Sequence, residues 1–175
     1  MTSWIFGYGS LIWHPGFQPA QRLGARLMGW QRAFCMRSVH YRGSVAAPGL
    51  VLALDAAPGA FCDGVALALP EADKPQILAN LRAREMTASA YVERVLPLRL
   101  ADGRAVEAIC YVIDRAHPLY APLSLDAQAE IIARAVGDRG SNAEYLFNTV
   151  THLAELGLPD AQLDRLATQV RQVMG

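Results

Sequence analysis

The sequence predicts an α+β domain in which a small, mostly antiparallel β-barrel is surrounded by helices. Two observations support this prediction. The first two-thirds of the chain contains short runs of strand-forming residues separated by turns, and the last third shows helical periodicity. Six strands are expected, at Trp4–Tyr8, Gln31–Met36, Leu50–Leu54, Gly64–Leu69, Tyr91–Leu100 and Val106–Ile113. One helix, at about Ala72–Arg84, interrupts them.

Turn signals separate the predicted strands. Pro48-Gly49 and Pro58-Gly59 each lie between two strand-like runs. Asp102-Gly103 lies between the last two runs, and this dipeptide tolerates the positive φ angles of a tight primed turn. We therefore expect an antiparallel hairpin over residues 91–113.

Three helices are expected in the last third. Ser124–Val136 begins with a serine, has an acidic residue in its first turn and ends at Gly137. Ser141 begins the second helix, since Ser141-Asn142-Ala143-Glu144 has the form of a capping box, and this helix ends near Gly157. The third starts at Pro159 and has apolar residues at helical spacing, namely Leu163, Leu166, Val170 and Val173.

Composition restricts the class of protein. Hydrophobic residues make up 53% of the chain and charged residues 18%, which is typical of a folded domain. With no repeat or linker in view, residues 1–175 are expected to form a single domain. Sixteen basic residues balance sixteen acidic ones without a basic block, so no nucleic-acid partner is expected. No apolar run approaches the ~18 residues that span a bilayer, so no membrane partner is expected either.

Cysteines and histidines give no sign of a metal site. Cys35, Cys62 and Cys110 lie far apart among apolar neighbours, so packing explains them better than disulfides or zinc. The four histidines have no i,i+4 pairing and no clustered acidic ligands; they are His14, His40, His117 and His152. No signal peptide is visible at the N-terminus, and the scattered thiols fit a reducing compartment, so a cytoplasmic location is expected.

The first candidate for chemistry is the segment Phe6–Trp13, which reads Phe-Gly-Tyr-Gly-Ser-Leu-Ile-Trp. A strand ends there in a turn with two glycines, where the backbone can approach a ligand closely. Consecutive N–H groups in such a turn can hold a carboxylate or a developing oxyanion. A plain turn whose glycines only relieve crowding is an equal alternative.

Three familiar motifs do not fit this turn. The dinucleotide fingerprint needs glycine where Ile12 stands, and a P-loop needs a Gly-Lys-Ser/Thr sequence that is absent. A nucleophile elbow around Ser10 needs glycine in place of both Tyr8 and Ile12. The turn is therefore a candidate for binding rather than for nucleophilic attack.

The second candidate is Glu85. Counting back by four, seven and eight residues reaches Leu81, Leu78 and Ile77, so Glu85 continues the apolar stripe of the predicted helix. Burial of a carboxylate raises its pKa, as a general acid or base working near neutral pH requires. The alternative is an ion pair with Arg82 or Arg84 that only stabilises the helix end.

Several segments together resemble the ChaC family of glutathione-specific γ-glutamylcyclotransferases. The resemblance extends over nearly the whole chain, with the motifs in matching order. The matching segments are Phe6–Trp13, Tyr41-Arg42-Gly43 with Pro48-Gly49, Arg84-Glu85-Met86 with Tyr91, His117–Tyr120 and Gly140–Phe147. The glycine turn alone marks the wider superfamily, whereas the helix with Glu-Tyr-Leu-Phe at 144–147 and the Arg-Glu-Met element with Tyr91 indicate ChaC.

The resemblance implies a small β-barrel with helices around it, no metal and no organic cofactor. It implies that Glu85 is catalytic and that the turn holds the γ-glutamyl group of the substrate through Gly7, Tyr8, Gly9, Ser10, Leu11 and Ile12. Arg42, Tyr91 and Tyr145 are expected to be further substrate contacts. For Arg42 a solvated strand end, and for Tyr145 a place in the core, are the alternatives.

Two departures from the family pattern concern substrate contacts. Leu50 stands where many relatives have arginine, and Met86–Ala90 replaces the Lys-Gly-Gly of animal relatives. The bacterial branch also has methionine at that point, so we interpret the second departure as a branch difference.

The reaction that the resemblance implies is cleavage of glutathione to 5-oxoproline and Cys-Gly. The α-amine of the γ-glutamyl group attacks its own γ-carbonyl, and Glu85 acts as general acid and base. The alternatives are a cyclotransferase for other γ-glutamyl amino acids or amines, and a non-catalytic small-molecule binder. The oligomeric state is not specified by the sequence.

Overall fold

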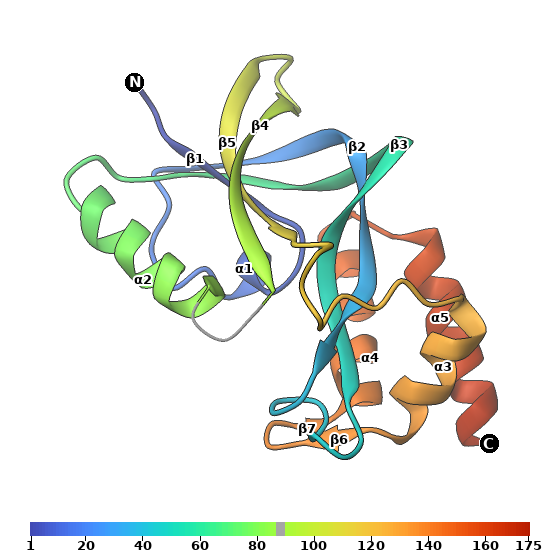
Figure 1. Ribbon diagram of the computed structural model, residues 1–175. Helices are drawn as coiled ribbons and strands as arrows, with labels where there is room; N and C mark the ends of the chain where they lie inside the picture. Colours follow the sequence, from blue (N-terminus) through green and yellow to red (C-terminus); the bar gives the residue numbers. More distant parts are fainter. Residues whose placement is uncertain (87–89) are drawn as a thin grey trace. The chain divides into compact units, whose positions relative to one another are not determined.

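The computed structural model describes residues 1–86 and 90–175 (Figure 1). Residues 87–89, inside the Met86–Ala90 departure from the animal proteins, lie outside the described residues. The elements in chain order are β1 (Trp4–Gly7), α1 (Ser10–Trp13), β2 (Gln21–Ser38), β3 (Gly49–Ala68), α2 (Lys74–Met86), β4 (Tyr91–Leu100), β5 (Ala105–Ile113), α3 (Leu125–Arg134), β6 (Val136–Gly137), β7 (Gly140–Ser141), α4 (Asn142–Glu155) and α5 (Ala161–Met174).

The chain divides into two compact units, and the long strands β2 and β3 each contribute residues to both. Unit 1 consists of residues 1–32 and 54–115, and unit 2 of residues 33–53 and 116–175. A single domain over residues 1–175 stays a prediction.

Strands β1 to β5 close into a barrel in the order β1-β3-β2-β4-β5, with an additional β3–β5 pairing. The β1–β3, β2–β4 and β4–β5 pairs are antiparallel, whereas β5 runs parallel to β1 and β3. The prediction of a small, mostly antiparallel barrel with helices outside it is therefore confirmed.

Strand β3 is a single element of 20 residues, so the prediction of two separate strands at Leu50–Leu54 and Gly64–Leu69 was wrong. The Pro58-Gly59 signal does not reverse the chain. Gly59 has a φ of 83°, and an added Cβ there would have no heavy atom within 4 Å. One left-handed glycine within a strand can redirect it without ending it. Strand β2 likewise extends far beyond the predicted Gln31–Met36.

The predicted hairpin of β4 and β5 is present, but its turn is not of the primed two-residue type. The Leu100 N–H donates to the Arg104 carbonyl at 2.8 Å, which leaves three residues in the loop. Of the described residues other than glycine, none has a positive φ, and Gly103 has a φ of 92°. Because a three-residue loop needs only one left-handed position, Gly103 alone supplies it.

The interior of unit 1 is apolar and closely packed. Ile5 and Phe6 of β1 are fully buried, and Tyr111 on β5 is 1% exposed. Full burial of such a side chain stabilises a fold by about 1.5–3 kcal/mol. Cys110 also lies here as a buried free thiol, and burial raises its pKa to about 12, so it stays protonated at neutral pH.

In unit 2, helices α3, α4 and α5 pack against one another, and a side chain caps each at its N-terminus (Figure 1). Ser124 Oγ accepts from the Ala127 N–H, Ser141 Oγ from the Glu144 N–H, and Asp160 from the first turn of α5. Helix α3 ends at Arg134 rather than at the predicted Val136, because residues 136–137 pair with residues 140–141 as β6 and β7.

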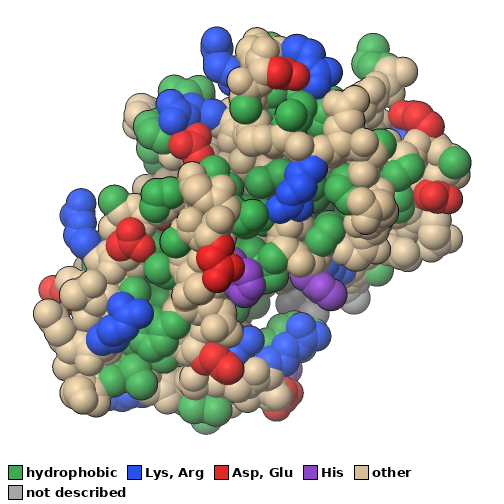
Figure 2. All heavy atoms as spheres, turned by 180° about the vertical axis from the view of Figure 1, so that it is seen from behind, with side chains coloured by type: hydrophobic (Ala, Val, Ile, Leu, Met, Phe, Trp, Pro, Cys, Tyr) green, Lys and Arg blue, Asp and Glu red, His purple; other side chains and the backbone are tan. Residues whose placement is uncertain are grey.

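The surface carries charges of both signs. On the face drawn in Figure 2, basic and acidic side chains of the described residues are interspersed. None of the helices within residues 1–86 and 90–175 combines the length and the hydropathy needed to cross a membrane.

Candidate active site

The glycine turn of unit 1 connects β1 to the short helix α1. Gly7 ends the strand and Ser10 begins the helix, while the Ile12 N–H donates to the Gly9 carbonyl at 2.9 Å. A Cβ on Gly7 would lie 3.2 Å from Ile12 Cγ1, so at this position glycine does relieve crowding. Leu11 and Ile12 are buried, which leaves the backbone N–H groups and the partly exposed Ser10 as the groups suited to a ligand.

Two hydrogen bonds fix Tyr8, the residue between the two glycines. Its hydroxyl donates to the Tyr111 carbonyl at 3.0 Å, and its own carbonyl accepts from Arg32 Nε at 2.8 Å. Arg32 is only 4% exposed and also donates to the Asp63 carbonyl at 2.6 Å. A buried guanidinium thus lies against the turn, and its positive charge favours an anion there. Sequence reasoning missed Arg32, because a single arginine in a strand-like run carries no local signal.

Glu85 occupies the last turn of α2, on the stripe with Leu81 and Ile77, both of which are buried. Its side chain is 15% exposed. Loss of hydration raises the pKa of this carboxyl, while the charge of Arg84 acts in the opposite direction and offsets part of the rise. The stripe predicted this partial burial, and the outcome is a carboxylate with a raised pKa, as a general base requires.

Arg84 connects Glu85 to the glycine turn within unit 1, where α1 and the C-terminal end of α2 lie side by side (Figure 1). Its Nε lies 3.3 Å from Glu85 Oε1. Its Nη1 donates to the His14 carbonyl at 2.6 Å and its Nη2 to Ser10 Oγ at 3.1 Å. The ion pair foreseen as the alternative for Glu85 is therefore present, but its arginine also holds the turn.

A second carboxylate lies on the hairpin beside this site. Glu93 on β4 is paired across the sheet with Tyr111 on β5, and the Tyr111 hydroxyl donates to Glu93 Oε2 at 3.1 Å. Arg82 of α2 donates to both oxygens of Glu93, at 2.9 and 3.0 Å, and these bonds are the main cause that lowers the Glu93 pKa. Burial and then the Glu93 charge raise the Tyr111 pKa, with Glu85 as a smaller cause, so this hydroxyl remains a donor.

Tyr91, a sequence-predicted substrate contact, begins β4 in the same unit. It lies two residues before Glu93 and pairs with Ile113 across the hairpin. Residues two apart in a strand point to the same face, so Tyr91 and Glu93 share one side of the sheet. The side chain of Tyr91 is partly exposed.

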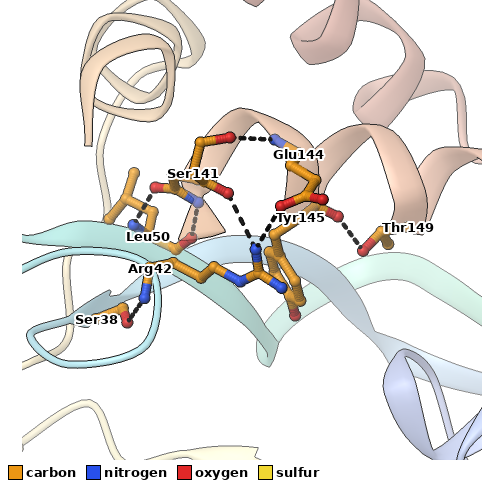
Figure 3. A network of polar contacts seen from close by, with 8 residues as sticks. Ser38, Arg42, Leu50, Ser141, Glu144, Tyr145 and Thr149 are labelled. Carbon is orange, nitrogen blue, oxygen red and sulfur yellow. Dashed lines mark hydrogen bonds and ion pairs between the residues drawn. The ribbon is translucent and has the colours of Figure 1, made fainter. Parts of the chain in front are cut away.

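Arg42 and Tyr145 come together in unit 2 (Figure 3). The Arg42 guanidinium carbon lies 5.3 Å from the Tyr145 ring centroid, and Nη1 donates to the Ser141 carbonyl at 3.1 Å and to Glu144 Oε2 at 3.3 Å. The Arg42 side chain is 17% exposed, so it is not the solvated strand end considered as its alternative. Tyr145 contacts Phe34 edge-to-face, with 5.7 Å between ring centroids.

Metal-ligating side chains do not gather within the part of the chain that the structure describes. No three histidine, cysteine, aspartate or glutamate side chains are grouped there as an ion would need.

The architecture is that of the γ-glutamylcyclotransferases. The chain superposes on a crystal structure of a yeast γ-glutamyl cyclotransferase specific to glutathione with a TM-score of 0.88 and 22% sequence identity, covering 98% of this chain and 96% of that one. In sequence, the model of the ChaC-like protein family matches residues 3–173. The chain belongs to the ChaC family.

Relatives in bacteria, plants and animals share the sequence along nearly its full length. The glutathione-specific γ-glutamylcyclotransferase of Escherichia coli K12 is 40% identical over 98% of this chain and 74% of that protein. γ-Glutamylcyclotransferase 2-3 of Arabidopsis thaliana is 33% identical over 99% of this chain and 91% of that protein. Human glutathione-specific γ-glutamylcyclotransferase 1 is 31% identical, over 97% and 78% respectively.

Proposed function

We propose that this protein is a lyase that cleaves glutathione to 5-oxoproline and Cys-Gly, with Glu85 as its general acid and base. The observation that best supports the chemistry is the carboxylate of Glu85, partly buried and linked through Arg84 to the glycine turn. The substrate is supported by the relatives in Escherichia coli and human, whose names specify glutathione.

The reaction begins with deprotonation of the substrate. The α-amine of the γ-glutamyl group is protonated at neutral pH and cannot attack its own γ-carbonyl. Glu85 removes one proton, and its raised pKa makes it a stronger base than an ordinary carboxylate. The freed nitrogen attacks the γ-carbonyl and closes the five-membered ring.

The glycine turn binds the γ-glutamyl group and stabilises the oxyanion through the backbone N–H groups of residues 9–11. Loss of one such donor costs about 10²–10³-fold in rate in other enzymes. The side chains of Tyr8, Leu11 and Ile12 are buried and the Ile12 N–H already donates to the Gly9 carbonyl, so in this proposal the main chain of residues 9–11 provides the binding.

Collapse of the tetrahedral intermediate breaks the amide bond to cysteine. Glu85 returns its proton to the departing nitrogen, and the second proton lost from the α-nitrogen also ends there, so the α-ammonium of Cys-Gly forms with no net proton change. The nucleophile belongs to the substrate, so holding amine and carbonyl together is the main task of the enzyme, and such positioning can supply about 7–11 kcal/mol of the barrier.

Arg42, Tyr91 and Tyr145 are additional substrate contacts in this proposal. The Arg42 guanidinium contacts the Glu144 carboxylate and the Tyr145 ring, and these contacts hold it in one orientation. The reaction needs no metal or organic cofactor, and the buried free thiols suit the cytoplasm, where glutathione is reduced.

The test is to incubate chelator-treated protein with glutathione and, separately, with γ-Glu-Ala, and to quantify 5-oxoproline. We expect release from glutathione, and loss of that release in Glu85→Gln with substrate binding retained. Release from γ-Glu-Ala alone would transfer the protein to cyclotransferases of other γ-glutamyl amino acids. Release from neither substrate would contradict the enzyme assignment. Normal turnover by Glu85→Gln would contradict the catalytic role of Glu85.

A further inference from the structure

We infer that Arg84 is a positioning residue for the cyclisation, holding the carboxylate of Glu85 at a fixed place relative to the glycine turn. The inference rests on the proposed function and assigns a role that the catalytic glutamate and the turn do not supply by themselves. Arg84 would act through Glu85 and Ser10, without touching the reacting atoms.

The geometry of one guanidinium supports this role. All three nitrogens of Arg84 are engaged, with Nε at Glu85 Oε1, Nη1 at the His14 carbonyl and Nη2 at Ser10 Oγ. The guanidinium is planar and rigid, so the three partners are held in a fixed mutual arrangement. Ser10 and His14 are the first residue and the C-terminal cap of α1, so both ends of that helix are tied to the end of α2.

The contact with Ser10 also determines how that hydroxyl can serve a ligand. Because Ser10 Oγ accepts from Arg84 Nη2, the hydroxyl proton remains free to be donated elsewhere. Ser10 can therefore act as a donor toward an anion bound at the turn.

The charge of Arg84 has a separate effect on Glu85. Arg84 on its own helix lowers the pKa of this carboxyl, and Glu85 in turn is one of the causes that raise the pKa of Tyr111 on β5, whose hydroxyl is bonded to Glu93 on β4. Among them, Arg84 is the cation in contact with Glu85, and it offsets the effect of lost hydration. Without this charge the Glu85 pKa would rise further, and a higher pH would be needed to form the base.

Lysine and glutamine at this position separate geometry from charge. Arg84→Lys keeps the charge but cannot contact three partners, so we expect a kcat lower by about 10²-fold with KM changed much less, and an unchanged acidic limb of the kcat profile. Arg84→Gln loses the charge as well, so its acidic limb should move to higher pH. Arg104→Gln, which affects an exposed pair with Asp102 in the hairpin loop, is the matched control and should leave kcat unchanged.

Titration of the Glu85 carboxyl by carbon-13 NMR follows the ion pair without turnover. We expect a higher pKa in Arg84→Gln than in the unmodified protein, and a value near the unmodified one in Arg84→Lys. Full kcat in both variants would overturn the inference. It would also be overturned if kcat fell only in proportion to the fraction of unfolded protein, while the acidic limb of the kcat profile and the NMR titration of Glu85 stayed unchanged. An unmodified protein without 5-oxoproline release would refute the proposed function, whereas the NMR titration would still decide whether Arg84 controls Glu85.

Discussion

The Asn142 side chain forms two hydrogen bonds with the backbone N–H and carbonyl of Leu50, as a neighbouring strand would. Its Oδ1 accepts from the Leu50 N–H and its Nδ2 donates to the Leu50 carbonyl, each at 2.7 Å. Asn142 is fully buried at the first position of α4, and Leu50 is fully buried near the start of β3. One side chain therefore joins helix to strand inside unit 2, at the position where the sequence departs from the family pattern.

Replacement of this amide should be costly. In Asn142→Ala the two backbone groups of Leu50 lose their partner while remaining buried, and we expect a loss of about 2–5 kcal/mol in the free energy of unfolding. Urea titration followed by far-UV circular dichroism measures it. Asn148→Ala on the exposed side of the same helix is the control, with an expected change within about 0.5 kcal/mol. Equal stabilities of the two variants would show that Asn142 is not an essential link.

A methyl group at Gly64 should disturb the glycine turn through the strand that precedes it. The Cβ would clash with the Gly7 carbonyl and lie 2.8 Å from the Phe6 ring, and both residues belong to the strand that leads into the turn. We expect Gly64→Ala to lose about 1–3 kcal/mol of stability and to release 5-oxoproline more slowly. The control is Gly24→Ala, whose Cβ would meet Ala101 Cβ at an ordinary 3.6 Å. Thermal melts and rate assays on both proteins compare them, and wild-type behaviour of Gly64→Ala would contradict the clash.

Glu85→Gln should be more stable than the unmodified protein at neutral pH. Burial raises the pKa of Glu85, so the folded state binds its proton more tightly than the unfolded chain does. Stability contributed by this proton is present below the unfolded pKa of about 4.3 and is lost as pH rises through the folded pKa. The gain from glutamine should therefore be larger at pH 8 than at pH 4. Melting temperatures across this range measure it, and a gain that shrinks as pH rises would reverse the sign.

Arg32 should matter for both stability and affinity. Arg32→Met removes the donors to the Tyr8 and Asp63 carbonyls and the buried charge near the turn. We expect a loss of about 1–3 kcal/mol, because one buried and one partly buried acceptor are left without these bonds, and a higher KM for an anionic substrate. Arg32→Lys, which keeps the charge, should recover more of the KM than of the stability. A KM unchanged in Arg32→Met would show that the charge does not assist binding.

Local patterns predicted the elements of this fold better than their pairing. The apolar stripe of Ile77 and Leu81 predicted the burial of Glu85, because helical spacing alone decides which side a residue faces. The contact between Glu93 and Tyr111 could not be predicted in the same way. A two-residue turn at Asp102-Gly103 would have set Glu93 opposite Val112, and the three-residue loop sets it opposite Tyr111.

The bonds of Arg84 and Arg32 depend on tertiary structure in the same sense. Arg84 contacts His14 and Ser10, which lie 70 and 74 positions earlier in the chain, and Arg32 contacts Tyr8, which lies 24 positions earlier. A sequence pattern reports the spacing along one element, whereas these bonds depend on how two elements lie against each other. Residue patterns made the turn and Glu85 candidates and the family resemblance implied their roles, and the geometry adds the arginines that contact them.

Tyr8 is hydrogen-bonded through both its hydroxyl and its carbonyl, and this affects how a ligand binds to the turn. A flexible loop must give up conformational freedom when it closes on a ligand, and that loss weakens binding. Here the backbone between the two glycines is ordered when the chain folds, before any ligand arrives. Association should therefore be limited by diffusion and desolvation rather than by loop rearrangement, and the backbone order of residues 8–11 should be nearly the same with and without a ligand.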